Sequence, residues 1–197
     1  MKKVALFGGT FDPVHNGHLK VAETVVNKCN YDELWFVPSA VSPHKDENMF
    51  SFSDRIYMIQ LAINYKQGFK IWDKDIRQND KSYTIFLVRE LINQFKDYEF
   101  SFVIGADNVL KLKTWKDYQE LLKMITFIVV NRNTDNKECL ENLEYYSKLR
   151  FVFMPEYNIS SSELRKMINN HQNISGLVSP AVESFIKTKI ISKIDKE

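Results

Sequence analysis

The alternation of two hydrophobic patterns constrains the fold of this chain more than any other sequence feature. Short apolar runs, which are typical of buried strands, occur at residues 4–7, 34–37, 69–72, 100–104, 125–130 and 151–153. Apolar residues recur at helical spacing at 19–26, 53–66, 83–95, 160–170 and 179–190. Because a helix between two strands returns the chain to the same edge of a sheet, this order favours parallel strands covered on both faces.

The predicted fold class is therefore α/β, with a doubly wound, Rossmann-like and mostly parallel sheet, helices on both faces and additional C-terminal helices. The length of 197 residues fits one domain spanning 1–197, on which a helical portion of about 155–197 is expected to pack. The aperiodic segment 38–50 is predicted to be a loop. The polar segment 131–142 is predicted to be a surface connection or a short helix.

The charge balance weighs against a nucleic-acid partner. The chain has 27 Lys and Arg against 25 Asp and Glu, which gives a formal net charge of +2. Nucleic-acid-binding proteins are usually more lopsided and carry a basic stripe interleaved with aromatic residues, which this sequence lacks. Nothing in this balance argues against a small anionic substrate.

The sequence favours a soluble, cytoplasmic protein without a membrane partner. The apolar run at 4–7 is shorter than the roughly 7–15 apolar residues of a secretory signal. The run at 125–130 is far below the ~20 residues that span a bilayer. Cys29 and Cys139 form no C-x-x-C pair, so we expect two reduced thiols rather than metal ligands or a disulfide.

The first junction between a strand and a helix carries the strongest signal of chemistry. Gly8 and Gly9 end the first strand, where doubly wound folds bind ligands, and glycine permits close approach of the backbone. His15 and His18 follow at the start of the next helix, three residues apart, and are expected to project on one side. A helix N-terminus attracts phosphate. Two surface histidines are the alternative, but half of the four histidines lie in this one turn, which favours a polyphosphate site.

A second candidate anion site lies near the C-terminus. Ser160 and Glu163 have the spacing of a capping box, which predicts a helix start. Arg165 lies in the first turns of that helix, where a cation opposes the helix dipole unless an anion is bound there. The segment therefore has two interpretations, a cap alone or a phosphate cradle of hydroxyls, amides and a guanidinium.

Residues 8–18, G-G-T-F-D-P-V-H-N-G-H, resemble the signature of the nucleotidyltransferase superfamily that carries an H-x-G-H motif. Residues 159–165, I-S-S-S-E-L-R, resemble a second motif of that superfamily, I-S-S-[ST]-x-x-R. The resemblance implies catalytic roles for His18, His15 and Arg165. It implies ATP binding by Gly8, Gly9, Thr10, Phe11, His15, His18, Gly105, Asp107, Ile159, Ser160, Ser161 and Arg165.

Further stretches resemble one branch, the bacterial nicotinate-nucleotide adenylyltransferases. They are Pro43-His44-Lys45, Ser82-Tyr83-Thr84, Ile104-Gly105-Ala106-Asp107 with Trp115 downstream, and Val129-Val130-Asn131-Arg132. The resemblance implies that the mononucleotide is bound by Lys45, Tyr83, Thr84, Asp107, Trp115, Lys116 and Arg132. It also shows one departure, because relatives often place an aromatic residue at the position of Lys116.

The residues themselves leave several of these roles open. Trp115 among lysines is either half-buried packing or a stacking platform for the pyridine ring. Asp107 is either a helix cap or an acceptor for ribose hydroxyls. Tyr83 and Thr84 could simply open a helix, and Lys45 could be solvated.

The implied reaction joins nicotinate mononucleotide to the AMP part of ATP and releases pyrophosphate. The substrate phosphate is the nucleophile, so the protein needs neither a general base nor a nucleophile of its own. Mg²⁺ is expected to arrive bound to ATP, and no residue is predicted to hold a metal. ATP and nicotinate mononucleotide are thus the expected partners, and homo-oligomer formation stays open.

Two alternatives to this reaction remain at the level of the sequence. A related H-x-G-H nucleotidyltransferase would use nicotinamide mononucleotide, phosphopantetheine or a polyol phosphate. A regulatory module would bind ATP or NAD as a sensor without turnover.

Overall fold

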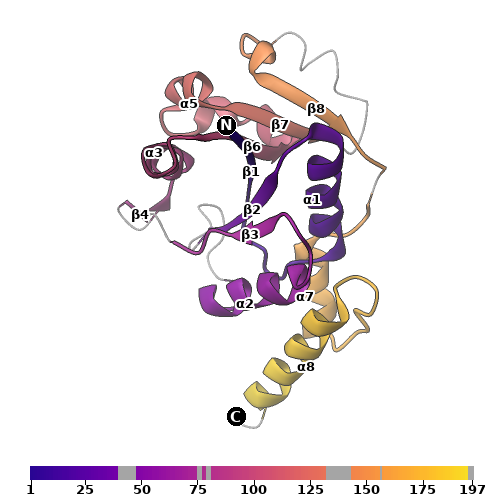
Figure 1. Cartoon of the computed structure of the whole chain (residues 1–197). Coiled ribbons are helices and arrows are strands. Elements are labelled where there is room, and N and C mark those ends of the chain that lie inside the picture. The colour runs from indigo at the N-terminus through magenta and orange to yellow at the C-terminus, as the bar shows by residue number, and fades with distance from the viewer. Residues whose placement is uncertain (40–47, 75–76, 79–80, 132–142, 156, 195–197) are drawn as a thin grey trace.

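A six-stranded parallel sheet forms the centre of the molecule (Figure 1). The computed structural model describes residues 1–39, 48–74, 77–78, 81–131, 143–155 and 157–194. The strands are β1 (Lys2–Gly9), β2 (Glu33–Pro38), β3 (Phe69–Ile71), β6 (Tyr98–Gly105), β7 (Thr126–Asn131) and β8 (Leu149–Phe153). Their order is β3-β2-β1-β6-β7-β8, and every neighbouring pair is parallel. The order reverses between β1 and β6, so the switch point at which such folds bind ligands lies between these two strands.

The five helices predicted from apolar spacing are present. They are α1 (Asn16–Cys29), α2 (Phe52–Ile63), α3 (Thr84–Gln94), α7 (Ser161–Asn169) and α8 (Pro180–Ile194). Several short elements were not predicted: α4 (Ala106–Val109), η1 (Leu112–Thr114), α5 (Tyr118–Met124), η2 (Tyr146–Lys148), and the antiparallel pair β4 (Arg77–Gln78) and β5 (Lys81–Ser82). None of them exceeds seven residues, which is too short for a clear apolar period.

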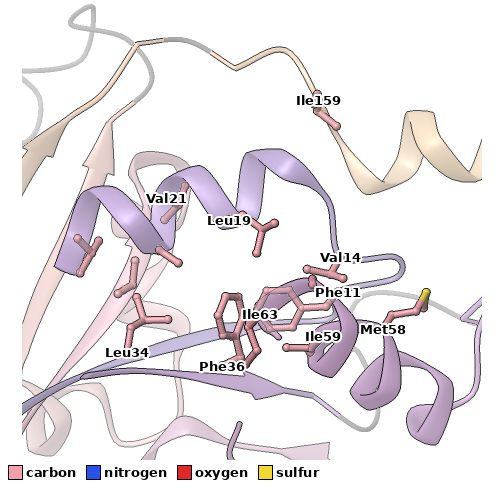
Figure 2. Packing of buried hydrophobic residues seen from close by; sticks show 14 of the residues in the cluster. Phe11, Val14, Leu19, Val21, Leu34, Phe36, Met58, Ile59, Ile63 and Ile159 are labelled. Carbon is pink, nitrogen blue, oxygen red and sulfur yellow. The ribbon is translucent and has the colours of Figure 1, made fainter. Parts of the chain in front are cut away.

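Both faces of the sheet are buried, which confirms the doubly wound fold class. Along β1, Val4 and Leu6 belong to the hydrophobic cluster under α3 and α5, whereas Ala5 belongs to the cluster under α1 and α2. Figure 1 shows α1 and α3 on opposite sides of the sheet. In the cluster on the α1 side, Phe11 lies beside Phe36 from β2 and beside side chains of α2 (Figure 2).

The C-terminal helices share this hydrophobic cluster. Leu164 of α7 and Val182 and Ile186 of α8 are almost completely buried in it. An ion pair of 2.7 Å between Lys189 Nζ and Asp54 Oδ1 also links α8 to the first turn of α2. The helical portion therefore packs on the α2 side of the sheet, while one domain spanning 1–197 stays a prediction.

Three further expectations concern a membrane span, the two cysteines and the segment 131–142. Within the described ranges, no helix is both long and apolar enough to cross a membrane. Cys29 is a free, buried thiol, and burial raises its pKa, whereas Cys139 lies outside the described residues. The predicted segment 131–142 is described only at Asn131, the last residue of β7.

Two isoleucines of α8 test whether the C-terminal helices contribute to the core. Ile186 is 1% exposed and Ile191 is 59% exposed. We expect Ile186→Ala to lower the free energy of unfolding by about 2–5 kcal/mol, because it leaves a cavity in the shared cluster. Ile191→Ala, the matched control, should change it by no more than about 0.5 kcal/mol. Urea unfolding followed by circular dichroism measures both, and equal effects would contradict the shared core.

Candidate active site

The candidate site lies where β1 and β6 end, at the switch point of the sheet. Gly8 and Gly9 are the last residues of β1, and Gly105 is the last residue of β6. A Cβ on Gly8 would lie 2.5 Å from the ring of Phe102, so only glycine fits this crossing of strand and aromatic ring. Sequence and structure therefore agree on where the ligand-binding edge is.

The loop after β1 is held in a sparsely populated backbone conformation. Phe11 has a φ of 51°, in the left-handed region, and its side chain is 1% exposed. The ring packs edge-on against Phe7, Phe36 and His18, at centroid distances of 5.0 to 5.5 Å. Burial of the ring stabilises a conformation that costs of the order of 1–3 kcal/mol, and such positions often occur at functional sites.

His15 and His18 cap the start of α1 reciprocally. His15 is the N-cap residue, and its Nδ1 accepts the backbone N–H of His18 at 3.4 Å. The Nδ1 of His18 accepts the backbone N–H of His15 at 3.3 Å. The two rings stack with their centroids 3.7 Å apart, which confirms that the histidines project on one side. Because an accepting Nδ1 carries no hydrogen, each neutral ring carries its hydrogen on Nε2, and that N–H is its donor.

Gly17 and the aromatic residues near it fix the orientation of the histidine pair. A Cβ on Gly17 would lie 2.9 Å from Nδ1 of His15, so glycine lets that ring lie against the helix backbone. Phe11 and Phe7 pack edge-on behind the ring of His18. His15 is 3% exposed, and His18 is half-buried and more accessible. His18 is therefore the more accessible of the two stacked rings.

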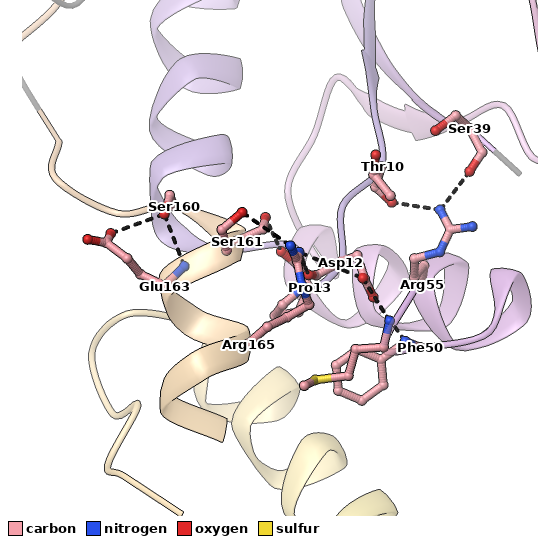
Figure 3. Close-up of polar contacts among 12 residues, drawn as sticks. Thr10, Asp12, Pro13, Ser39, Phe50, Arg55, Ser160, Ser161, Glu163 and Arg165 are labelled. Carbon is pink, nitrogen blue, oxygen red and sulfur yellow. Dashed lines mark hydrogen bonds and ion pairs between the residues drawn. The ribbon is translucent and has the colours of Figure 1, made fainter. Parts of the chain in front are cut away.

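The C-terminal motif forms the predicted helix start. Ser160 is the N-cap residue of α7, and its Oγ accepts the backbone N–H of Glu163 at 3.1 Å (Figure 3). The reciprocal half of the predicted capping box differs, because the Glu163 carboxylate accepts from the Ser160 hydroxyl rather than from its backbone. The cap is thus confirmed, and the Ser160 hydroxyl makes both of its hydrogen bonds, one to the backbone and one to the side chain of Glu163.

The structure brings the two sequence motifs together. Ser161 Oγ donates to the carbonyl oxygen of Pro13 at 3.1 Å, and Arg165 Nη1 donates to that of Asp12 at 2.8 Å (Figure 3). The carbonyl oxygen of Ile159 also lies 3.8 Å from the Cβ position of Gly17. The first turn of α7 is therefore docked on the loop that leads into the histidine pair.

Asp12 is a buried residue to which the sequence assigned no role. Its side chain is fully buried, and its carboxylate oxygens accept the backbone N–H groups of Met49 and Phe50 at 2.9 and 3.0 Å. The same carboxylate lies 3.7 Å from Nη1 of Arg165. The signal was available, since Asp12 stands inside the matched motif, but its partners are distant in the sequence.

Arg55 is a second buried residue that the sequence analysis missed. Its Nη1 donates to the carbonyl oxygens of Thr10 and Ser39, each at 2.7 Å, and so ties the loops after β1 and β2 together (Figure 3). Burial lowers the pKa of Arg55, and attraction to the Asp12 carboxylate opposes that shift. A signal existed here too, because Arg55 occupies the buried face of α2 one turn before Ile59.

The residues predicted for the mononucleotide side lie around the starts of α3 and α5. Tyr83 is the N-cap residue of α3 and Thr84 its first residue, so both open a helix. Lys116 Nζ lies 5.0 and 4.8 Å from the ring centroids of Tyr83 and Phe86. These contacts place the ammonium group of Lys116 over the first turn of α3.

Trp115 makes packing contacts but is not fully buried. The ring contacts Phe102 and Phe127 edge-on, at centroid distances of 5.9 and 6.2 Å, and remains partly exposed. Packing of Trp115 is thus confirmed, and stacking on a ligand stays a prediction.

The remaining predicted positions are Asp107, Lys45 and Arg132. The N-cap of α4 is Gly105, and Asp107 is the second residue of that helix, so the interpretation of Asp107 as the cap is wrong. The sequence could not distinguish the two, because both residue types occur at helix caps. Lys45 and Arg132 lie outside the described residues. No group of three or more His, Cys, Asp or Glu side chains able to hold a metal ion occurs in the described part of the chain.

Similarity to known proteins assigns this chain to a class of enzymes. A model of the cytidylyltransferase-like family matches residues 6–167. The chain is 40% identical over 188 residues to a probable nicotinate-nucleotide adenylyltransferase of Bacillus licheniformis, with 95% of this chain and 96% of that protein covered. It is 38% identical over 190 residues to a probable nicotinate-nucleotide adenylyltransferase of Shouchella clausii, with 96% of each covered. The chain therefore belongs to the cytidylyltransferase-like family and is a nucleotidyltransferase. Within that class it is a member of the nicotinate-nucleotide adenylyltransferase family.

A solved structure supports the fold. The nicotinic acid mononucleotide adenylyltransferase of Plasmodium falciparum, complexed with NaAD, has a TM-score of 0.80 against this chain at 23% identity. All of this chain and all of that chain are covered. At this identity the likeness confirms the Rossmann-like fold over the whole length.

The reciprocal cap predicts coupled effects on stability. We expect His15→Ala and His18→Ala each to lower the free energy of unfolding by about 1 kcal/mol, because each removes one capping bond and the ring stacking. The double substitution should cost less than the sum, because the stacking is lost only once. Lys20→Ala, at an exposed position of the same helix, should change stability by less than about 0.5 kcal/mol. Urea titrations provide the four values, and strict additivity would contradict the stacked pair.

Proposed function

We propose that this chain transfers the adenylyl group of ATP to nicotinate mononucleotide, giving nicotinate adenine dinucleotide and pyrophosphate in NAD biosynthesis. The observation that carries the proposal is the docking of Ser161 and Arg165 on the loop before His15 and His18. This arrangement gathers imidazole, guanidinium and helix N-terminal amide groups at the end of β1, where a triphosphate would be stabilised. The names of the relatives support the choice of substrates.

Catalysis in this proposal depends on charge stabilisation rather than on proton transfer. A phosphate monoester has a second pKa of about 6, so the attacking phosphate is mostly dianionic at pH 7. The protein must hold two anions together and stabilise charge on the bridging and leaving oxygens. We assign the Nε2–H of His18 to the α-phosphate and its transition state, and His15 to the β- and γ-phosphates. Arg165, Ser160 and Ser161 are assigned to the leaving pyrophosphate.

The serines are assigned to pyrophosphate through their backbone amides. The hydroxyl of Ser160 already bonds Glu163, and that of Ser161 already donates to Pro13. Their N–H groups lie at the start of α7, where the helix dipole favours negative charge. The remaining proposed ATP contacts are Gly8, Gly9, Thr10, Phe11, Gly105, Asp107 and Ile159.

Mg²⁺ is treated as part of the ATP substrate. The groups described at the phosphate site are mostly imidazole, guanidinium and amide groups, whereas Mg²⁺ prefers oxygen ligands. The carboxylate of Asp12 already accepts two backbone N–H groups. When bound to ATP, the ion would neutralise phosphate charge, and the residues named above would orient the complex.

On the mononucleotide side, we propose that Trp115 stacks on the pyridine ring and that Lys116 favours the acid substrate. The ammonium of Lys116 lies beside Tyr83, directly before Thr84 at the start of α3. A positive charge there would attract the carboxylate of nicotinate more than the neutral amide of nicotinamide. Lys45, Asp107 and Arg132 remain proposed contacts to the same substrate.

An assay with two substrates tests the function directly. The purified protein would be mixed with ATP and either nicotinate or nicotinamide mononucleotide, with pyrophosphate release as the readout. We expect release with the acid substrate and slower release with the amide. Further reactions would contain phosphopantetheine or a polyol phosphate as the acceptor, and release only with one of these would indicate a different member of the superfamily. Tight ATP binding without pyrophosphate release from any acceptor would indicate a nucleotide sensor.

The role of His18 predicts a large effect on turnover with little effect on the fold. We expect His18→Ala to lower kcat by ~10²–10³, the loss typical of removing one donor to a transition state. Circular dichroism should show an unchanged fold. Lys20→Ala, two residues further along the same helix, should keep normal turnover. Near-normal turnover of His18→Ala would contradict the assignment.

Trp115→Ala separates stacking from packing. We expect it mainly to raise KM for the mononucleotide, while kcat falls less and the protein stays folded. Steady-state kinetics and the unfolding midpoint measure the two effects. Loss of the folded state would instead mean that the contacts with Phe102 and Phe127 are its main role.

The cellular setting stays a prediction. We infer a cytoplasmic protein that binds small nucleotides rather than nucleic acid or a membrane surface. The balanced charge and the free, buried thiol of Cys29 support this inference.

A further inference from the structure

Asp12 is a fully buried carboxylate in the phosphate site, and the proposed mechanism gives it no task. We propose that Asp12 is a positioning residue that directs the guanidinium of Arg165 toward the bound phosphates. The inference rests on the proposed function only in that Arg165 binds the phosphates of ATP. It deepens that function by explaining how Arg165 on α7 is oriented toward the phosphate site at the end of β1.

The carboxylate of Asp12 is itself held in one place. Its Oδ2 accepts the N–H of Met49 and its Oδ1 accepts the N–H of Phe50, so both oxygens are fixed by backbone groups that precede α2. A carboxylate fixed in this way does not rotate to follow a partner. It therefore provides a rigid reference point for a mobile side chain such as arginine.

Arg165 is held from two sides. Its Nη1 donates to the Asp12 carbonyl oxygen at 2.8 Å and lies 3.7 Å from the Asp12 carboxylate. Its Nη2 donates to Ser162 Oγ at 3.1 Å. The side chain is 19% exposed, so it is not fully enclosed by the protein. A planar guanidinium fixed at two nitrogens presents its remaining N–H groups in one direction.

The charges near Asp12 explain why an acidic residue is tolerated beside a phosphate site. Within the described ranges, this carboxylate interacts with the guanidinium groups of both Arg55 and Arg165. One negative charge against two positive charges leaves the surroundings of the phosphates positive. A buried ion pair is costly to desolvate and contributes little net stability, so precise positioning is the better reason for its presence.

Positioning and simple repulsion predict opposite changes in ATP affinity when the charge of Asp12 is removed. If Asp12 only repels ATP, Asp12→Asn tightens ATP binding. If Asp12 aims Arg165, Asp12→Asn weakens ATP binding while Arg165 is present. Without Arg165 there is no guanidinium for Asp12 to position, so Asp12→Asn should then leave ATP binding unchanged or tighten it.

A double-mutant cycle on ATP affinity tests this. Isothermal titration with Mg-ATP, and with no mononucleotide present, would compare wild type, Asp12→Asn, Arg165→Ala and the double variant. We expect Asp12→Asn to raise Kd for ATP about tenfold in the wild-type background. In the Arg165→Ala background it should change Kd by less than about twofold, or lower it. Because binding requires no turnover, this cycle gives an answer even if the proposed transfer reaction fails.

Asp54→Asn is the matched control. Asp54 is another aspartate paired with a cation, Lys189. Burial raises the pKa of its carboxyl group, but the bonds to Lys189 and Ser51 outweigh that effect and lower the pKa overall. Its substitution removes the same charge from the start of α2, where the partner of the carboxylate is Lys189 rather than Arg165. We expect the unfolding midpoint to fall while Kd for ATP stays within about twofold of the wild-type value.

Two outcomes would overturn the proposal. Equal weakening by Asp12→Asn in both backgrounds would mean that Asp12 only maintains the loop, and tighter binding in the wild-type background would mean simple repulsion. If Asp12→Asn does not fold, Arg165→Lys replaces it. Lysine keeps the charge but cannot bond Asp12 and a phosphate in one fork, so it should lose most of the affinity that Arg165→Ala loses. Affinity near that of wild type in Arg165→Lys would also refute positioning.

Discussion

The docking of α7 on the loop after β1 is the contact on which the site depends. Arg165 and Ser161 bond the carbonyl oxygens of Asp12 and Pro13, across sequence separations of 153 and 148 positions. Buried backbone carbonyls need a donor. Side chains of α7 therefore donate to two loop carbonyls, and these bonds in turn hold the guanidinium against the loop that leads into the histidine pair. Stability and chemistry share these bonds.

The backbone N–H groups at the start of α1 also need partners, and two imidazoles accept them. A serine or aspartate cap would satisfy the first amides of the helix, but aspartate would bring negative charge to a site for phosphate. His15 and His18 accept those amides through Nδ1 and keep a hydrogen on Nε2 as a donor. Gly17 is required because any side chain there would meet the ring of His15. The cap and the anion site thus use the same two residues.

The elements that could be predicted are those with a local pattern of sufficient length. The run at 125–130 predicted β7, and the spacing at 160–170 predicted α7 with Ser160 as its cap. The region from Ala106 to Met124 was not predicted, because its helices are too short to show a period. The interpretation of Asp107 as the cap of α4 is wrong for another reason, since aspartate and glycine both occur at helix caps and the cap is Gly105. Arg55 was missed because a long side chain on an apolar face gives no sign of which carbonyls it will reach.

By itself, the sequence determined the order of strands and helices, the edge of the sheet where ligands bind, and the two motifs that carry the chemistry. These features depend on periodicity and residue type, which are local. Only the tertiary structure decided that Arg165 meets Asp12, that Arg55 joins the loops after β1 and β2, and that the two histidines cap one another. The first two contacts are made to backbone carbonyls, which every residue carries, so no residue type marks which carbonyl is the partner. The third depends on the rotation of two rings, which residue spacing permits but does not specify.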